Sequence, residues 1–222
     1  MDANKSLLNL QILILFFLGI SFEGAQAKPR CPLITNNIGF SVTVIPKNID
    51  YHLGTSQNKL NKLANKSFKQ QVLGLTSTKH TISAKMTGQT NKISRRLYCT
   101  QVTYVDITIT VLNLDVYLLG KYPRGSCQYN AIIDHEHEHI ATYQTGINNL
   151  EQTFNDKLSN MIEKLSPGMA STAKISRKIA FKNMSDSIAR VRLPIEQAMK
   201  IRDKQLDSPL NYKMLSQKCA SW

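Results

Sequence analysis

The sequence contains no pair of cysteines at the Cys-x-x-Cys spacing typical of structural zinc sites, so a cysteine metal cluster is not expected. Its four cysteines are Cys31, Cys99, Cys127 and Cys219. An even number suggests two disulfides if the protein folds in an oxidising compartment, and the sequence alone allows three connectivities. We expect Cys99–Cys127, which would tie a strand to the loop before a long helix, and Cys31–Cys219, which would tie the two ends of the chain.

After residue 27 the sequence also lacks any stretch apolar enough to span a bilayer. Before that point, Lys5 precedes the apolar run Leu7–Ile20, and the motif Ala25–Ala27 follows it. This three-part pattern is typical of a secretory signal peptide, here residues 1–27. The alternative is an uncleaved membrane anchor, for which the run is short and is interrupted by polar residues. We expect cleavage after Ala27, a secreted or periplasmic protein, and no membrane contact after cleavage.

Acidic residues are scarce, with 15 Asp and Glu against 28 Lys and Arg. Removal of residues 1–27 leaves 27 basic and 13 acidic residues, a net charge of +14. Such a charge favours polyanions, so a polyanionic component of the cell envelope is one expected partner. The basic residues form no block, however, and a solvated surface is the simpler interpretation. No nucleic acid partner is expected.

Internal repeats and low-complexity tracts are absent, and residues 28–222 fit a single domain, which we expect to be a monomer. Alternating and β-branched residues predict strands over 39–45, 79–88 and 98–119, the last divided by a tight connection at Asn113. A short helix is predicted within 56–68. Helical patterns follow over about 129–165, 170–205 and 210–218. Strands followed by helices predict an α+β fold, with an N-terminal antiparallel sheet and a helical second half.

One pattern on the first long helix carries chemistry: His135-Glu136-x-x-His139. Residues four apart share a helix face, so both histidines can direct a ring nitrogen at one cation. Glu136 lies about 100° around the helix, where it can reach a metal-bound water without ligating the metal. Apolar residues border this face, while His137 and Glu138 point elsewhere. A zinc hydrolase needs this arrangement; the alternative is a charged helix turn with three exposed histidines.

The stretch Tyr98–Tyr143 resembles a family of bacterial proteins described as predicted secreted zinc-dependent proteases. The matching features are a strand that begins at Cys99, the pair Val116-Tyr117, Cys127, and a helix from Tyr129 that carries the His-Glu-x-x-His motif. The segment Gln205–Cys219 is similar to the family's turn with an aspartate and its last helix with a cysteine. The resemblance is loose outside the metal helix. It implies a zincin-like metalloprotease fold for residues 28–222.

A catalytic zinc ion needs three protein ligands and one open position. The extended spacing that would supply a third histidine is absent, because Ile140–Thr145 contain no glycine or histidine. Asp207 is the best candidate, since zinc peptidases with an aspartate ligand carry a tyrosine a few positions later, as Tyr212 does here. The glycines of that pattern are missing. Asp207 suits a helix N-cap equally well, and His52 and His80 are fallback ligands.

These observations predict an exported zinc-dependent metallopeptidase that hydrolyses peptide bonds in a peptide or protein substrate. The expected zinc ligands are His135, His139 and Asp207. Glu136 is the expected general base, and Tyr212 would stabilise the oxyanion of the tetrahedral intermediate. The alternative is a non-catalytic exported protein with a structural or degenerate metal site that binds a component of the envelope.

Overall fold

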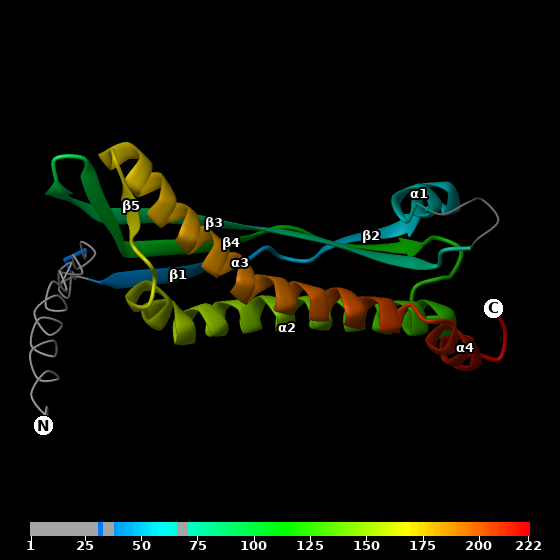
Figure 1. Cartoon of the computed structure of the whole chain (residues 1–222). Coiled ribbons are helices and arrows are strands. Elements are labelled where there is room, and N and C mark those ends of the chain that lie inside the picture. Colours follow the sequence, from blue (N-terminus) through cyan, green and yellow to red (C-terminus); the bar gives the residue numbers. More distant parts are fainter. Residues whose placement is uncertain (1–30, 33–37, 66–70) are drawn as a thin grey trace, which may run out of the picture. The chain divides into compact units, whose positions relative to one another are not determined.

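The computed structural model describes residues 31–32, 38–65 and 71–222. The expected signal peptide lies outside these residues, so its cleavage stays a prediction. No helix in the described ranges is long and apolar enough to cross a membrane. The α+β class is confirmed, because strands dominate the first half of the chain and helices the second (Figure 1).

One sheet is organised around its longest strand. Its members are β1 (Gly39–Ile45), β2 (Asp50–Thr55), β3 (Gly74–Ser94), β4 (Leu97–Leu119) and β5 (Gly168–Ala170). β3 pairs antiparallel with β4 over its full length, while β5, β1 and β2 follow one another along the other edge of β4. β1 and β2 run parallel to β4, so the sheet is mixed, whereas an antiparallel sheet was expected. The chain reverses once between β2 and β3 and again in the β3–β4 hairpin, which restores the original direction.

β4 is one continuous strand of 23 residues, not two strands joined at Asn113 as expected. Its pairing with β3 skips Thr103 and Leu112, which places a β-bulge at each of these residues. A bulge inserts one extra residue and so shifts the alternation of side chains between the two faces. The two shifts keep one face of the strand buried along its length. The buried apolar residues of this face are Val102, Val105, Ile107, Ile109, Leu114, Val116 and Leu118.

Two long helices pack against each other and against the sheet (Figure 1). The long helices are α2 (Cys127–Glu163) and α3 (Ala173–Leu206). Two short helices, α1 (Gln57–Leu63) and α4 (Pro209–Gln217), complete the described part of the chain. Serine side chains cap α2 and α4: Ser126 accepts from the N–H of Tyr129, and Ser208 accepts from the N–H of Asn211. Buried residues recur every three or four positions along α2, which turns one face of this helix towards the core.

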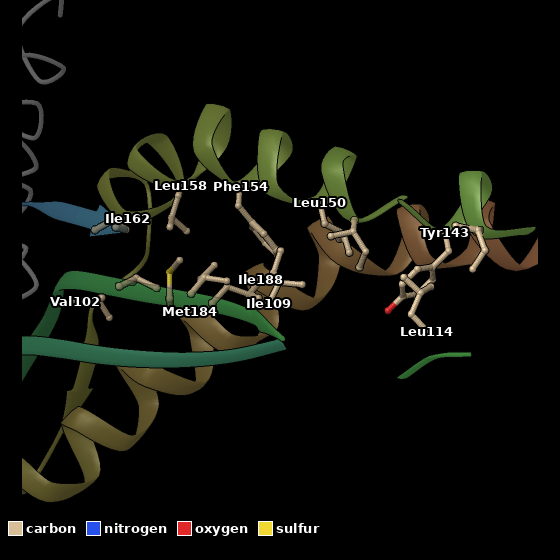
Figure 2. Close-up of a cluster of buried hydrophobic side chains, with 14 of the residues drawn as sticks. Val102, Ile109, Leu114, Tyr143, Leu150, Phe154, Leu158, Ile162, Met184 and Ile188 are labelled. Atoms are coloured by element: carbon tan, nitrogen blue, oxygen red, sulfur yellow. The ribbon is translucent and has the colours of Figure 1, made fainter. Parts of the chain in front are cut away.

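The core fills the space between α2, α3 and β4 (Figure 2). Phe154 and Leu158 of α2 are fully buried, as are Ile109 of β4 and Met184 of α3. Each such side chain stabilises the fold by about 1.5–3 kcal/mol through removal of its apolar surface from water. The same packing fixes the rotation of α2, the helix that carries the His-Glu-x-x-His motif.

The structure contains two disulfides, the number expected, but their pairing differs from the expected one. Cys31 bonds Cys99, and Cys127 bonds Cys219. The described residues include no free cysteine. Cys99 lies near the start of β4, and Cys127 follows the end of that strand. Twenty residues of strand span about 60 Å, so the expected bond between Cys99 and Cys127 is impossible in this fold.

Candidate metal centre

α2 presents its motif residues to the interior as its periodicity predicts. His135, Glu136 and His139 are 8%, 3% and 7% exposed. His137 and Glu138, on the remaining faces of the same turn, are exposed to solvent. The reading of the motif as a turn with three exposed histidines is therefore wrong. The buried stretch of α2 places two imidazoles and one carboxylate side by side.

Asp207 brings a third candidate ligand to the two histidines. It is the C-cap of α3, and its Oδ1 lies 3.5 Å from Nε2 of His135 and 3.3 Å from Nε2 of His139. The N-cap of α4 is the next residue, Ser208, so the structure does not use Asp207 as an N-cap. His135, His139 and Asp207 form a group that could hold a metal ion.

The dimensions of this group suit a tetrahedral ion. The Nε2 atoms of His135 and His139 are 3.3 Å apart, and Oδ1 of Asp207 completes a triangle with sides of 3.3–3.5 Å. Ligand atoms held roughly 2.0–2.2 Å from zinc at tetrahedral angles are about 3.3–3.6 Å from one another. The three side chains therefore fit three corners of a tetrahedron and leave the fourth corner for water or substrate.

Asp203 holds His139 from behind. Its Oδ1 lies 2.6 Å from Nδ1 of His139, so the ring donates from Nδ1 and directs Nε2 towards His135 and Asp207. A carboxylate behind a histidine in this way fixes the tautomer and the ring orientation of a metal ligand. Burial lowers the pKa of His139, but hydrogen bonds to Asp203 and Asp207 outweigh it and raise the pKa to about 10. Without a metal, the ring is therefore a cation at neutral pH, with both nitrogens protonated.

Asp207 is itself oriented by a neighbour in the next helix. The hydroxyl of Tyr212 donates to Oδ1 of Asp207 at 2.9 Å, and the Tyr212 ring lies 5.6 Å from that of His135. Burial raises the pKa of Asp207, but hydrogen bonds from His135, His139 and Tyr212 outweigh it and hold the pKa well below its usual range. Burial, together with the charge of Asp207, raises the pKa of Tyr212. At neutral pH Asp207 is an anion, and Tyr212 keeps its proton.

Glu136 lies beside the group without belonging to it. The hydroxyl of Thr76 in β3 donates to Oε2 of Glu136 at 2.7 Å. Gly74 leaves room for the other oxygen, since a Cβ there would collide with Oε1 of Glu136 and lie 2.8 Å from Cγ2 of Ile132. Burial raises the pKa of Glu136 and outweighs the hydrogen bond from Thr76 and the two histidines, which lower it. A carboxylate with a raised pKa is suited to accept a proton near neutrality.

These side chains reach solvent through a cleft of about 390 Å³ between α4 and the chain that leads into β3. Its lining includes His135, Glu136, Asp207 and Tyr212, together with residues 71–74. A larger hollow of about 720 Å³ lies between α2 and α3 and contains none of these residues. The small cleft is the one that matters chemically, because His135 and Asp207 of the metal group line it together with Glu136.

The fallback histidines lie elsewhere. His52 pairs with Asp115 at 3.1 Å, and His80 pairs with Glu196 at 3.4 Å. Among the described residues, the metal group contains neither of them. The sequence interpretation missed Asp203, although it precedes Asp207 by four positions and therefore shares its helix face. It also missed Thr76, which no local pattern could have identified, because a hydroxyl on a strand acquires this role only through the packing of β3 against α2.

The Cys127–Cys219 disulfide connects the two parts of the centre. It joins the first residue of α2 to the chain just after α4, so the helix that carries His135 and the helix that carries Tyr212 are covalently tied. Within α4, Leu215 packs in a small cluster with Ala131 of α2.

In comparisons with protein-family models, curated proteins and solved structures, nothing matches this chain.

Proposed function

We propose that the chain is an exported zinc-dependent metallopeptidase. One observation carries this proposal: the triangle formed by Nε2 of His135, Nε2 of His139 and Oδ1 of Asp207 lies beside the buried carboxylate of Glu136, at the edge of an open cleft. Three ligands with an open fourth position characterise catalytic zinc sites, whereas structural sites are closed by four protein ligands.

The donor set favours zinc over other divalent ions. Two imidazole nitrogens suit zinc, copper, nickel or iron, whereas calcium and magnesium prefer oxygen ligands. The triangle has tetrahedral dimensions, which agree best with zinc. Asp203 adds the hydrogen-bonded carboxylate that commonly supports a zinc-bound histidine.

Glu136 is the proposed general base. A bound zinc ion lowers the pKa of its water to roughly 7. Glu136 would accept the proton of that water, because its carboxylate is buried, has a raised pKa and is held by Thr76 through only one oxygen. It would then deliver the proton to the amine that leaves when the peptide bond breaks.

Tyr212 is the proposed donor to the oxyanion. Tyr212 lines the same cleft as His135 and Glu136, and its hydroxyl donates to Asp207. Once Asp207 binds the metal, that hydroxyl would be free to donate to a substrate oxygen instead of the carboxylate. One hydrogen-bond donor to the oxyanion is worth about 10²–10³ in kcat in other hydrolases.

Export forms part of the same proposal. The two disulfides in the described part of the chain agree with an oxidising compartment. The N-terminal pattern of residues 1–27 supplies the targeting signal. We also propose that the chain belongs to the family of predicted secreted zinc-dependent proteases, because its metal-binding helix is similar to the one in that family.

The substitution Glu136→Gln tests the peptidase. It is nearly isosteric and leaves the three ligand residues in place, so the zinc content should not change. Peptide hydrolysis should fall by about 10²–10⁴-fold, the usual contribution of a general base. The measurement is mass spectrometry of a mixed peptide library incubated with equal amounts of zinc-loaded wild type and variant.

Glu138→Gln is the matched control, because it makes the same change two residues further along α2 at an exposed position. It should cleave the library like wild type. Hydrolysis by Glu136→Gln at the wild-type rate would refute the role of Glu136. If wild type binds zinc and cleaves no peptide of the library, the peptidase must be abandoned in favour of a structural metal site.

A further inference from the structure

The cleft at the metal group continues away from it into a second hollow. This hollow has a volume of about 230 Å³ and shares four lining residues with the cleft: Gln71, Leu73, Tyr212 and Leu215. Its other walls include Tyr122 and Trp222. A ligand that lies along the cleft at Glu136 can therefore extend one side chain into the second hollow.

The walls of the second hollow are largely apolar. The rings of Tyr122 and Trp222 meet edge to face with their centroids 5.9 Å apart, and Leu73 and Leu215 add aliphatic surface. The indole N–H of Trp222 donates to the carbonyl of Ser216 at 2.7 Å, so it is already satisfied within the protein. The indole can therefore contact a ligand through its apolar surface. Aromatic rings provide a large apolar contact area.

The hollow is held in shape by contacts at the end of α4. The Cys127–Cys219 disulfide fixes the start of this segment, and the side chain of Gln128 donates to the carbonyl of Ser221 at 2.5 Å. These bonds run between α2 and the residues after α4. They tie the residues before Trp222 to the start of α2, the helix that carries Glu136.

The hollow contains one charged group, Lys121. Its Nζ lies 4.9 Å from the centre of the Tyr122 ring and donates to the Tyr122 hydroxyl at 3.2 Å. This cation is exposed and lies over the ring of Tyr122, and no contact of it with Leu73, Leu215 or Trp222 is seen among the described residues. An acidic side chain could pair with it only at the rim, in water, where an ion pair is worth little.

We propose that the hollow formed by Leu73, Tyr122, Leu215 and Trp222 is a subsite for a large apolar side chain of the substrate, such as leucine or phenylalanine, next to the bond that is cleaved. This inference rests on the proposed peptidase and adds its substrate class. Apolar pockets discriminate by size, and each methylene that the pocket accommodates changes affinity by about 10-fold or more. Peptides with glycine or an acidic residue at that position are poor ligands.

Trp222 supplies a direct probe, because it is the only tryptophan of the chain and it lines the hollow. The experiment titrates zinc-loaded Glu136→Gln protein with blocked hexapeptides of alanine whose third or fourth residue is glycine, leucine, phenylalanine or glutamate. Tryptophan emission and the anisotropy of labelled peptide are followed together. The leucine or phenylalanine peptide should bind at least about tenfold more tightly than the glycine peptide and shift the emission.

Tyr122→Ala should reduce that preference, whereas Tyr104→Ala, which removes an exposed tyrosine of β4 outside the cleft, should preserve it. Equal binding of the leucine and glycine peptides, tighter binding of the glutamate peptide, or no binding of any peptide overturns the subsite. The readout does not depend on turnover. A retained apolar preference without any cleavage by wild type would remove the peptidase and leave the subsite standing.

Discussion

The Nδ1 atom of His139 lies 2.6 Å from Oδ1 of Asp203, on the far side of the imidazole from the atom that faces His135 and Asp207. One aspartate thus orients the ring while another, one helical turn later, takes part in the ligand group. Both come from the last turns of α3. The end of this helix, which carries no recognisable metal motif, therefore completes a centre that the motif on α2 begins.

Asp203→Asn should weaken zinc binding by about 10–100-fold, because the neutral amide holds the His139 ring less firmly and makes its Nε2 a poorer donor. The change keeps the size of the side chain, so the fold should persist. Competition with a chelating dye measures the affinity. Asp186→Asn is the control, since Asp186 lies on the same helix and pairs with Lys182. Unchanged affinity in Asp203→Asn would show that this contact does not support the metal.

The centre was predictable from the sequence only where its geometry is local. The spacing of His135 and His139 within one helix fixes their shared face, and the apolar stripe of α2 fixes its rotation. Asp207 was identified through a family pattern and not from periodicity. Thr76 and Gly74 touch Glu136 only because β3 packs against α2, a contact between residues 60 positions apart that no local pattern encodes.

The fold shows the same limit. The cap Ser126 and the periodicity of α2 set a helix whose bounds follow from the sequence within about two residues. The bulges at Thr103 and Leu112 break the alternation of buried and exposed residues along β4. In the sequence, the second break looks like a turn at Asn113. The disulfide pairing could not be deduced, because it depends on which ends of the sheet and helices meet. The parallel placement of β1 also depends on the complete chain path.

Removal of the Cys127–Cys219 disulfide should affect both stability and the metal centre. The double variant Cys127→Ser/Cys219→Ser should lose about 2–5 kcal/mol of unfolding free energy. It should also bind zinc more weakly, because α4 is no longer tied to the start of α2. Urea unfolding and dye competition, at a temperature where the variant remains folded, measure the two effects.

The other disulfide provides the comparison. Cys31→Ser/Cys99→Ser should be destabilised to a similar degree and should keep its zinc affinity, since Cys99 lies at the end of β4 remote from α4. Equal losses of zinc affinity in the two double variants would mean that the effect is one of general stability and not of the position of α4.

Gly74→Ala should reduce peptide hydrolysis without loss of zinc. The new Cβ would collide with Oε1 of Glu136 and displace that carboxylate, while the three ligand side chains remain in place. Zinc content should therefore persist, and hydrolysis of a sensitive peptide should fall by about 10²-fold or more. Gly39→Ala in β1 is the control, because its Cβ would meet only the side chain of Tyr104. Full activity in Gly74→Ala would refute the role assigned to the position of Glu136.

Zinc binding should release a proton. In the metal-free protein the pKa of His139 is raised from 6.5 to about 10, so the ring is protonated at pH 7.5 and must lose that proton to bind an ion. Calorimetry in buffers of different ionisation enthalpy should find about one proton released per zinc at pH 7.5. The apparent affinity should rise with pH, by up to about tenfold per unit, until pH nears 10.

The contribution of His139 to the stability of the metal-free protein should fall as the pH rises, whereas the zinc affinity rises. A raised folded-state pKa stabilises the protein below the unfolded value of 6.5, and this stability is lost as the pH rises through about 10. Thermal unfolding of chelator-treated protein between pH 6 and pH 10 measures the effect. Zinc binding without proton release at pH 7.5 would contradict the proposed state of His139.

The most direct test is the zinc content of the purified protein by mass spectrometry, compared among wild type, His137→Ala, Asp207→Ala and His135→Ala/His139→Ala. Wild type and His137→Ala should each hold about one zinc per chain, because His137 lies outside the ligand group. Asp207→Ala should lose most of its zinc, and the double variant should hold none. Equal zinc in wild type and in the double variant would contradict the metal centre, and with it the function proposed for this chain.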